Sequence, residues 1–323
     1  MAIKKDAIGV NYGQIPDNLT QTFFAPNFSF RSVSSADVAK RRFERKIGDD
    51  VVEIIRFIFQ SGFVTLDQIN RGTGFSVDES FMDNLAMQHF VNYFVLSESM
   101  EEKLIQSPGD LKIYVLDFAG SYLLMAEGDD LTKWRHTDHF RSSKVIRKVL
   151  KQTELFIAFK NLKKLSIRDY QKNPNFRLGG EPYDIDFSVS LGVDNSFIPI
   201  NFIGVVAEKG KEDLFFSDTL RGINAIFKET KTGYKYYPLD SSTLPKLLVI
   251  IDDSTDTQSI IRTANVIGNC TDYSGSELMI LGYNEMVAVG LADAHYFSIR
   301  VTEDPQTGIR KVEVGSVTNA TLK

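Results

Sequence analysis

The sequence predicts a two-part protein of the α+β or α/β class, with a helical N-terminal part closed by a hairpin and then a mixed α/β sheet. Three observations predict it. Apolar residues recur at helical spacing from Asp50 to Phe90, two strand-like runs follow, and beyond Pro174 strand-like and helical runs alternate. The 323 residues suffice for two ordinary domains, and a hydrophobic content of 43% is typical of a globular chain.

Residues 1–47 show no clear period, and we interpret them as an extended N-terminal arm that packs on the body or on a partner. Glycines and prolines punctuate this arm, and several Phe side chains along it offer apolar contacts. A basic run, 40–46, lies near its end, with five cations and one carboxylate. We favour a solvated helical turn for this run over a contact with phosphates.

Residues 48–130 predict three helices. The first shows an apolar stripe from Val51 to Ile58, and Gly62 ends it. Thr65–Gln68 has the Thr-x-x-Gln form of a capping box, and Ser76–Glu79 has the Ser-x-x-Glu form of a second. A short second helix and a third helix are therefore expected to begin at these two boxes.

Two strand-like runs, Asn92–Leu96 and Lys112–Leu116, then predict a β-hairpin. The order of helix, short helix, turn, helix and hairpin is the plan of a winged helix-turn-helix, whose third helix enters the major groove of DNA. On that helix Asn84 and Gln88 are the candidate base-reading residues. Carboxylates on the same helix would weaken binding to phosphates, so the helix either reads bases or contacts protein. These carboxylates are Asp78, Glu79 and Asp83.

Residues 131–177 form a basic helical connector. They carry thirteen Lys and Arg against three Asp and Glu, although the whole chain has a net charge of −5. A local basic zone on an acidic protein is either a polyanion contact or a solvated helix face. Under the first interpretation, the candidate DNA-binding residues of this zone are Arg135, Arg141, Lys144, Arg147, Lys148 and Lys151.

Three further observations limit the kinds of site and the cellular location that we expect. His136 and His139 have i, i+3 spacing, but without a third ligand nearby we expect capping or packing rather than a metal site. The single cysteine, Cys270, excludes an internal disulfide framework and a Cys-based zinc site. No apolar run approaches the ~20 residues that cross a bilayer, and the N-terminus lacks an apolar signal region. We therefore expect a cytoplasmic protein without membrane contact.

Residues 178–323 predict an α/β domain with a mixed sheet, opened by the Gly179-Gly180 turn. The expected strands are Tyr183–Val189, Phe197–Val206, Lys246–Ile251, Leu278–Leu281 and Tyr296–Val301, and the expected helices are Asp218–Lys228 and Thr257–Ile267. Between them, Asp252–Asp256 either binds a metal or caps the following helix. We favour the cap, with Ser254 or Asp256 as the N-cap residue.

Several stretches resemble one known family. They are Phe57–Arg71, Ile113–Leu116 with the following Gly120 and Leu123-Leu124, and Arg135-His136 before the basic helix. In this order the chain, over roughly residues 48–300, is similar to the replication-relaxation proteins of plasmids and conjugative elements. The resemblance implies a winged helix followed by a domain similar to PD-(D/E)XK nucleases. It also implies a role in plasmid replication or conjugative DNA transfer, with a relaxase or another mobile-element protein as partner.

A PD-(D/E)XK site needs two acidic residues to hold Mg²⁺ and a lysine to position water. Glu208 is followed at plus two by Gly210, where the motif requires lysine. We therefore favour a nuclease-like fold without nuclease activity, and we interpret the acidic residues of the first strand as solvent-side carboxylates. The candidate residues for the alternative, an active Mg²⁺ nuclease, are Asp184, Asp186, Glu208, Lys209 and Lys211.

Together these features predict a non-enzymatic DNA-binding accessory protein of plasmid replication or conjugation. Its expected partner is double-stranded DNA, bound through the winged helix and the basic helix, and no cofactor is expected outside the Mg²⁺ nuclease alternative. A second alternative is a protein–protein adaptor in a mobile-element or phage assembly that binds no DNA. The acidic third helix and the Phe-rich arm would then be its contact surfaces.

Overall fold

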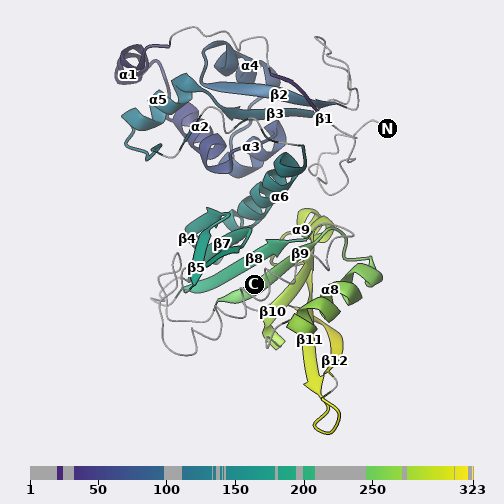
Figure 1. Cartoon of the computed structure of the whole chain (residues 1–323). Coiled ribbons are helices and arrows are strands. Elements are labelled where there is room, and N and C mark those ends of the chain that lie inside the picture. The colour runs from purple at the N-terminus through teal and green to yellow at the C-terminus, as the bar shows by residue number, and fades with distance from the viewer. Residues whose placement is uncertain are drawn as a thin grey trace. The chain divides into compact units, whose positions relative to one another are not determined.

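The computed structural model describes residues 20–24, 33–97, 111–132, 134–135, 139, 141, 143–178, 181–193, 199–207, 245–270, 275–308, 310–318 and 322. The chain divides into two units, Met1–Ile157 and Ala158–Lys323, so the boundary falls inside the connector expected over 131–177. The described part is of mixed α and β type, with eight helices and a seven-stranded mixed sheet (Figure 1).

The first unit contains the predicted series of helices and a hairpin. Helices α2 (Asp49–Ser61), α3 (Leu66–Thr73) and α4 (Glu79–Met87) are followed by strands β2 (Val91–Ser97) and β3 (Leu111–Leu116). The two strands pair antiparallel, as expected of a hairpin. The order of elements predicted from the sequence is therefore confirmed.

The capping signals predicted one helix start correctly and misplaced another. At α3, Thr65 accepts a hydrogen bond from the Gln68 N–H while the Gln68 side chain accepts from Thr65, so this capping box is confirmed. At α4, the N-cap is Asp78, whose carboxylate accepts from the Phe81 N–H at 2.8 Å. The predicted Ser76 cap is wrong because Asp78, two residues later, satisfies the third helical N–H.

The region expected as an arm contains two regular elements within its described residues. Strand β1 (Thr20–Phe24) pairs antiparallel with β2. Helix α1 (Ser35–Phe43) packs against α5 (Phe118–Ala126), which follows the hairpin. Only Val38 of α1 is buried, and a helix with one buried side chain gives no apolar period in the sequence.

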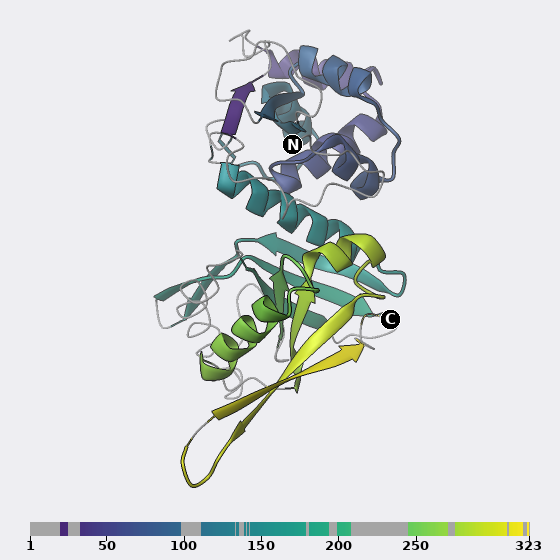
Figure 2. The same cartoon turned by 90° about the vertical axis from the view of Figure 1, so that its right-hand side faces the viewer.

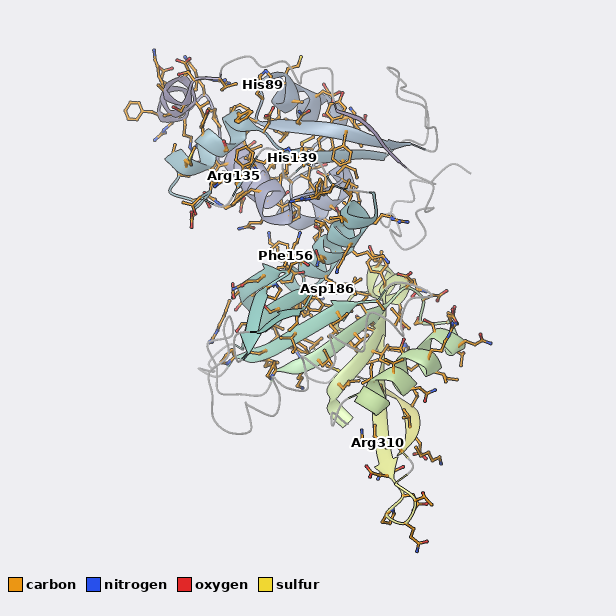
Figure 3. The ribbon with its side chains drawn as sticks, in the orientation of Figure 1. His89, Arg135, His139, Phe156, Asp186 and Arg310 are labelled. Atoms are coloured by element: carbon orange, nitrogen blue, oxygen red, sulfur yellow. The ribbon has the colours of Figure 1, made fainter. Side chains whose placement is uncertain are left out.

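Helix α6 (Ser143–Lys160) contributes to the core of the first unit. Its Phe156, labelled in Figure 3, stacks on Phe57 of α2 with ring centroids 6.0 Å apart. Ile157 belongs to the same buried cluster as Ile54 and Leu123. The basic helix predicted from the sequence is therefore a packed element of the fold.

The second unit is built on the seven-stranded sheet, in the order β12-β11-β10-β9-β8-β7-β4 (Figure 2). Strands β8, β9 and β10 pair parallel, and the other neighbours pair antiparallel. Alternation along a strand sends consecutive side chains to opposite faces. The strands are β4 (Leu165–Lys172), β7 (Phe187–Val193), β8 (Ile200–Val206), β9 (Lys246–Ile251), β10 (Gly275–Gly282), β11 (His295–Glu303) and β12 (Arg310–Thr318).

Helices pack on both faces of this sheet. Helix α8 (Thr257–Cys270) buries Ile260 against a cluster that includes Ile203 of β8. On the other face, the Phe159 ring near the end of α6 lies 6.0 Å from that of Phe202. Helix α9 (Tyr283–Val289) follows β10 directly.

The strand expected over Tyr183–Val189 is two strands. Strand β6 (Glu181–Asp184) pairs with β5 (Asn175–Leu178), and β7 begins at Phe187. The strand is interrupted around Asp186, whose side chain is 2% exposed and accepts a hydrogen bond from the Val206 N–H at 2.7 Å. The interpretation of Asp186 as a solvent-side carboxylate is therefore wrong, because a buried backbone donor holds it inside.

The helix expected over Asp218–Lys228 lies outside the described residues. Among the helices that are described, none combines the length and the apolar character needed to span a bilayer.

Candidate nucleic-acid interface

Helix α4 presents a narrow exposed strip. Ser80, Asn84 and Met87 are exposed and lie four and three residues apart, so they share one face of the helix. Met87 is 64% exposed. The strip consists of two polar side chains and one apolar side chain, and none of the three is charged.

The carboxylates of α4 are engaged with neighbouring groups. Lys112 of β3 places its Nζ 2.8 Å from Asp83 and 3.7 Å from Glu79. The same Nζ lies 4.5 Å from the centre of the Tyr93 ring. Asp78 is the N-cap of the helix. The Lys112 cation therefore offsets part of the repulsion of phosphates expected from Glu79 and Asp83, whereas Asp78 keeps its charge at the start of the helix.

The two predicted base readers contact each other. The Gln88 Nε2 donates to Asn84 Oδ1 at 2.7 Å, and Gln88 Oε1 accepts from the Arg41 guanidinium. Asn84 is exposed, whereas Gln88 is half-buried. Asn84 therefore faces solvent, and Gln88 holds the Asn84 amide and connects the end of α4 to α1.

Helix α1 is held against α4 and α5 by its arginines. Arg41 lies 5.6 Å from the centre of the Phe90 ring, just beyond α4. Arg42 pairs with Glu127 at 2.7 Å, after the end of α5. The hydrogen bonds that Arg42 donates to Glu127 and Asp49 raise the pKa of Arg42 further above its usual value. The two arginines thereby fix which side of α1 faces solvent.

The exposed side of α1 combines cations with an aromatic ring. Phe43 is 90% exposed, and the Lys40 side chain is 72% exposed. Arg45 and Lys46 are also exposed, and Lys46 pairs with Glu44 at 2.7 Å. We name Lys40, Phe43, Arg45 and Lys46 the α1 patch. Ammonium groups with an exposed ring are able to contact phosphates and bases.

The predicted outer face of α6 is only partly a surface. Lys151 is 8% exposed, so its assignment to an outer phosphate-binding face is wrong. Arg147 and Lys148 are half-buried, and the side chain of Lys144 lies outside the described residues. Arg135, labelled in Figure 3, and Arg141 are exposed. Arg135 donates to the carbonyls of Thr132 and Trp134, both at 2.8 Å.

The polar side of α6 is buried because it binds α3. The Glu154 carboxylate accepts from Arg71 at 2.6 Å and from Gln68 Nε2 at 2.9 Å. Gln68 Nε2 also donates to the Leu150 carbonyl at 3.0 Å. Burial lowers the pKa of Arg71, but its bonds to Glu154 and Asp67 outweigh burial and raise that pKa overall. A buried, paired network of this kind fixes α6 against the helix pair.

The proposed nuclease residues are only partly placed. Asp184 lies in β6 opposite Asn175, with its side chain outside the described set, and Glu208, Lys209 and Lys211 are also outside it. On β8, Gly204 pairs in register with Phe187, and its carbonyl accepts from the Asp186 N–H at 3.0 Å. A Cβ there would lie 2.0 Å from the Phe187 ring, so no acidic side chain fits at that position.

The described residues therefore do not fit a Mg²⁺ ion at this point. Asp186 supplies one buried carboxylate, and one of its oxygens accepts a backbone N–H. Across the described parts of the chain, no group of three or more His, Cys, Asp and Glu is arranged to hold a metal ion. Mg²⁺ binding by carboxylates at this point of the sheet would need side chains beyond those described.

Sequence reasoning missed two titratable groups near Asp186. Lys172 pairs in register with Phe187, the residue after Asp186, and burial lowers the pKa of this lysine to about 7. Tyr170 stacks on the Phe187 ring, and burial, together with the Asp186 charge, raises the pKa of Tyr170. No sequence signal pointed to them, because β4 precedes the turn at which strands were expected to begin.

The Asp252–Asp256 segment is a cap, as favoured. The Asp256 carboxylate accepts from the Ser259 N–H at 3.0 Å at the start of α8. Asp253 accepts from the Thr255 N–H at 2.8 Å and from Asn284 Nδ2 at 2.7 Å.

His139 is buried, and His136 is outside the described residues.

Comparisons with known proteins are sparse. No protein-family model and no curated protein matches this chain. Among solved structures, the restriction endonuclease FokI aligns with 74% of this chain and 43% of its own, at 12% identity and a TM-score of 0.28. The chain thus corresponds to less than half of the FokI chain, and a similarity this low carries no argument. The resemblance to replication-relaxation proteins stays a prediction.

Proposed function

We propose that the protein is a non-enzymatic DNA-binding accessory protein whose first unit is a winged helix. One observation supports this most directly. Arg41 of α1 contacts Gln88 just after the end of α4. Val38 of α1 and Leu85 of α4 also belong to one buried cluster, so the helix that carries the basic α1 patch and the helix that carries the uncharged strip are parts of one packed unit. In this proposal β2 and β3 form the wing, and α4 is the helix that enters the major groove.

The α1 patch supplies the affinity in this proposal. Lys40, Arg45 and Lys46 contact phosphates, and binding releases counterions from the DNA. Arg135 and Arg141 are further candidate phosphate contacts outside this patch. Asn84 contacts a base edge, because its amide is exposed and held by Gln88. The chemistry requires no cofactor.

The second unit serves as a nuclease-like scaffold in this proposal. The engagement of Asp186 by the Val206 N–H and the absence of a lysine two residues after Glu208 support a role without cleavage. The resemblance to replication-relaxation proteins favours a place in plasmid replication or conjugative transfer, beside a relaxase. An active Mg²⁺ nuclease would instead show divalent-metal-dependent cleavage that Glu208→Ala removes.

A titration of fluorescently labelled duplex DNA with the full chain, at about 50 and 200 mM salt, tests the proposal. We expect measurable binding that weakens steeply with salt, because several phosphates are contacted. Absence of binding at the lower salt would contradict it.

A protein–protein adaptor is the second candidate, and a specific observation favours it. Phe43 and Met87 are large apolar side chains left exposed on the first unit. Exposed apolar residues of this size often belong to protein contacts. Failure to bind DNA, with stable recovery of a protein partner that is lost on Phe43→Ala, would favour the adaptor.

A further inference from the structure

The two edge strands of the seven-stranded sheet, β4 and β12, differ in the regularity of their pairing. Along β4, the register with β7 shifts between Ile167 and Asp169, which marks a bulge or irregularity. Along β12, the nine residues from Arg310 to Thr318 pair with β11 without any shift, and none is proline. Bulges, prolines and charged side chains are the usual ways of blocking further strand pairing. Strand β4 has a bulge or irregularity, whereas β12 has neither bulge nor proline and carries only the charges of Arg310, Lys311 and Glu313.

Strand β12 is also accessible. Val314 is 38% exposed, and the residues on either side of it, Glu313 and Gly315, are exposed as well. Among the described strands, β12 is the last of its sheet on that side. Figures 1 and 2 show the β11–β12 hairpin extending past the ends of β9 and β10 within the second unit.

Contacts with α8 and β11 nevertheless hold β12 in place. Arg310 donates to the Gly268 carbonyl of α8 at 3.3 Å and pairs with Glu303 of β11 at 3.3 Å. Val312 packs against the buried cluster under α8. An anchored strand with an open edge is an ordered template for a further strand.

The charges along β12 are self-complementary. Lys311 and Glu313 lie on either side of Val312 and pair with each other within the strand at 2.9 Å. If a second β12 runs antiparallel about a two-fold axis through Val312, each Lys311 faces the Glu313 of the other copy. In the same register Arg310 faces Val314, so no like charges are opposed. Opposite charges directly across two strands stabilise their pairing.

We propose that a second copy of this chain pairs with β12 in this register and forms a homodimer with a sheet continuous across both copies. The second copy fits better than an unrelated peptide because the two-fold axis uses both Lys311–Glu313 contacts at once, and closed two-fold dimers are the commonest oligomers. The proposal does not depend on DNA binding.

Sedimentation velocity of the full chain, over a range of concentrations, measures the dimer directly. We expect a reversible species of twice the 36.4 kDa chain mass. Val314→Lys puts a cation opposite Arg310 of the second copy and is expected to raise the dimer Kd by about tenfold or more. The matched control, Lys164→Glu near the β4 edge, leaves the Kd unchanged.

A charge exchange tests the register independently of strand stability. Lys311→Glu alone places two carboxylates opposite each other and weakens the dimer, and Glu313→Lys alone does so with two cations. The double variant Lys311→Glu/Glu313→Lys restores the opposed charges and brings the Kd back to within about twofold of the original. Circular dichroism melting confirms that each variant is folded.

Three results would overturn the proposal. One is that the protein stays monomeric at every concentration up to about 100 μM, because a dimer with a Kd above that value is too weak for a specific association. Another is a dimer whose Kd does not respond to Val314→Lys. The last is a double charge variant that stays as weak as either single one.

Discussion

Helices α1 and α6 are both rich in Lys and Arg, but they place these side chains in opposite surroundings. In α1 only Val38 is buried, and Lys40 extends into solvent. In α6, Lys151 is 8% exposed and Glu154 is bound by α3. The difference shows that the number of cations in a stretch does not predict a surface. The number of neighbours that pack on the helix decides which of its charges stay free for a ligand.

Removing the buried carboxylate of α6 tests this comparison with the largest expected effect. Glu154→Ala leaves Arg71 and Gln68 without their shared acceptor, and we expect the free energy of unfolding to fall by about 3–5 kcal/mol. Urea unfolding followed by the fluorescence of Trp134, the only tryptophan, measures the loss in the first unit.

The matched control is Asp67→Asn, which removes the other partner of the same arginine. Asp67 is more exposed than Glu154, so we expect a loss of at most about 1 kcal/mol. If Glu154→Ala costs no more than this control, the buried network does not hold α6 in place.

A second prediction extends the comparison to two glycines of the second unit. A Cβ at Gly204 would lie 2.0 Å from the Phe187 ring, whereas a Cβ at Gly315 would lie 3.5 Å from Ser298. Gly204→Ala is therefore expected to destabilise the chain by about 1–3 kcal/mol, and Gly315→Ala by much less. Thermal melting by circular dichroism compares the two. Equal melting temperatures would mean that the Phe187 ring does not fill the space above Gly204.

Much of the fold could be predicted because its signals are local. The Thr65 capping box starts α3, and the apolar run Lys246–Ile251 forms β9 as expected. Of helix α1, only a helical turn in the run 40–46 was predicted, because a single buried residue leaves no apolar period. The break at Asp186 was not predicted either, because its partner, the Val206 N–H, is twenty residues away and only the folded sheet brings them together.

The candidate interface was predicted only where its signal was local in the sequence. Asn84 could be named from its position on the third helix, and the structure leaves it exposed. For the basic run at 40–46 the sequence favoured a solvated helical turn over a phosphate contact, and it could not show the contact of Arg41 with Gln88, which spans 47 residues of sequence. Lys151 was assigned to a surface because helical spacing alone does not reveal which side of α6 meets α3.

The most direct test of the proposed interface compares two pairs of exposed lysines in the same DNA titration. One variant is Lys40→Gln/Lys46→Gln in the α1 patch, and the other is Lys163→Gln/Lys164→Gln in the basic zone 131–177. If the α1 patch contacts phosphates, the first variant lowers the slope of log affinity against log salt by about 2, and the second leaves the slope unchanged. A slope that changes only in the second variant, or equally in both, would contradict the account.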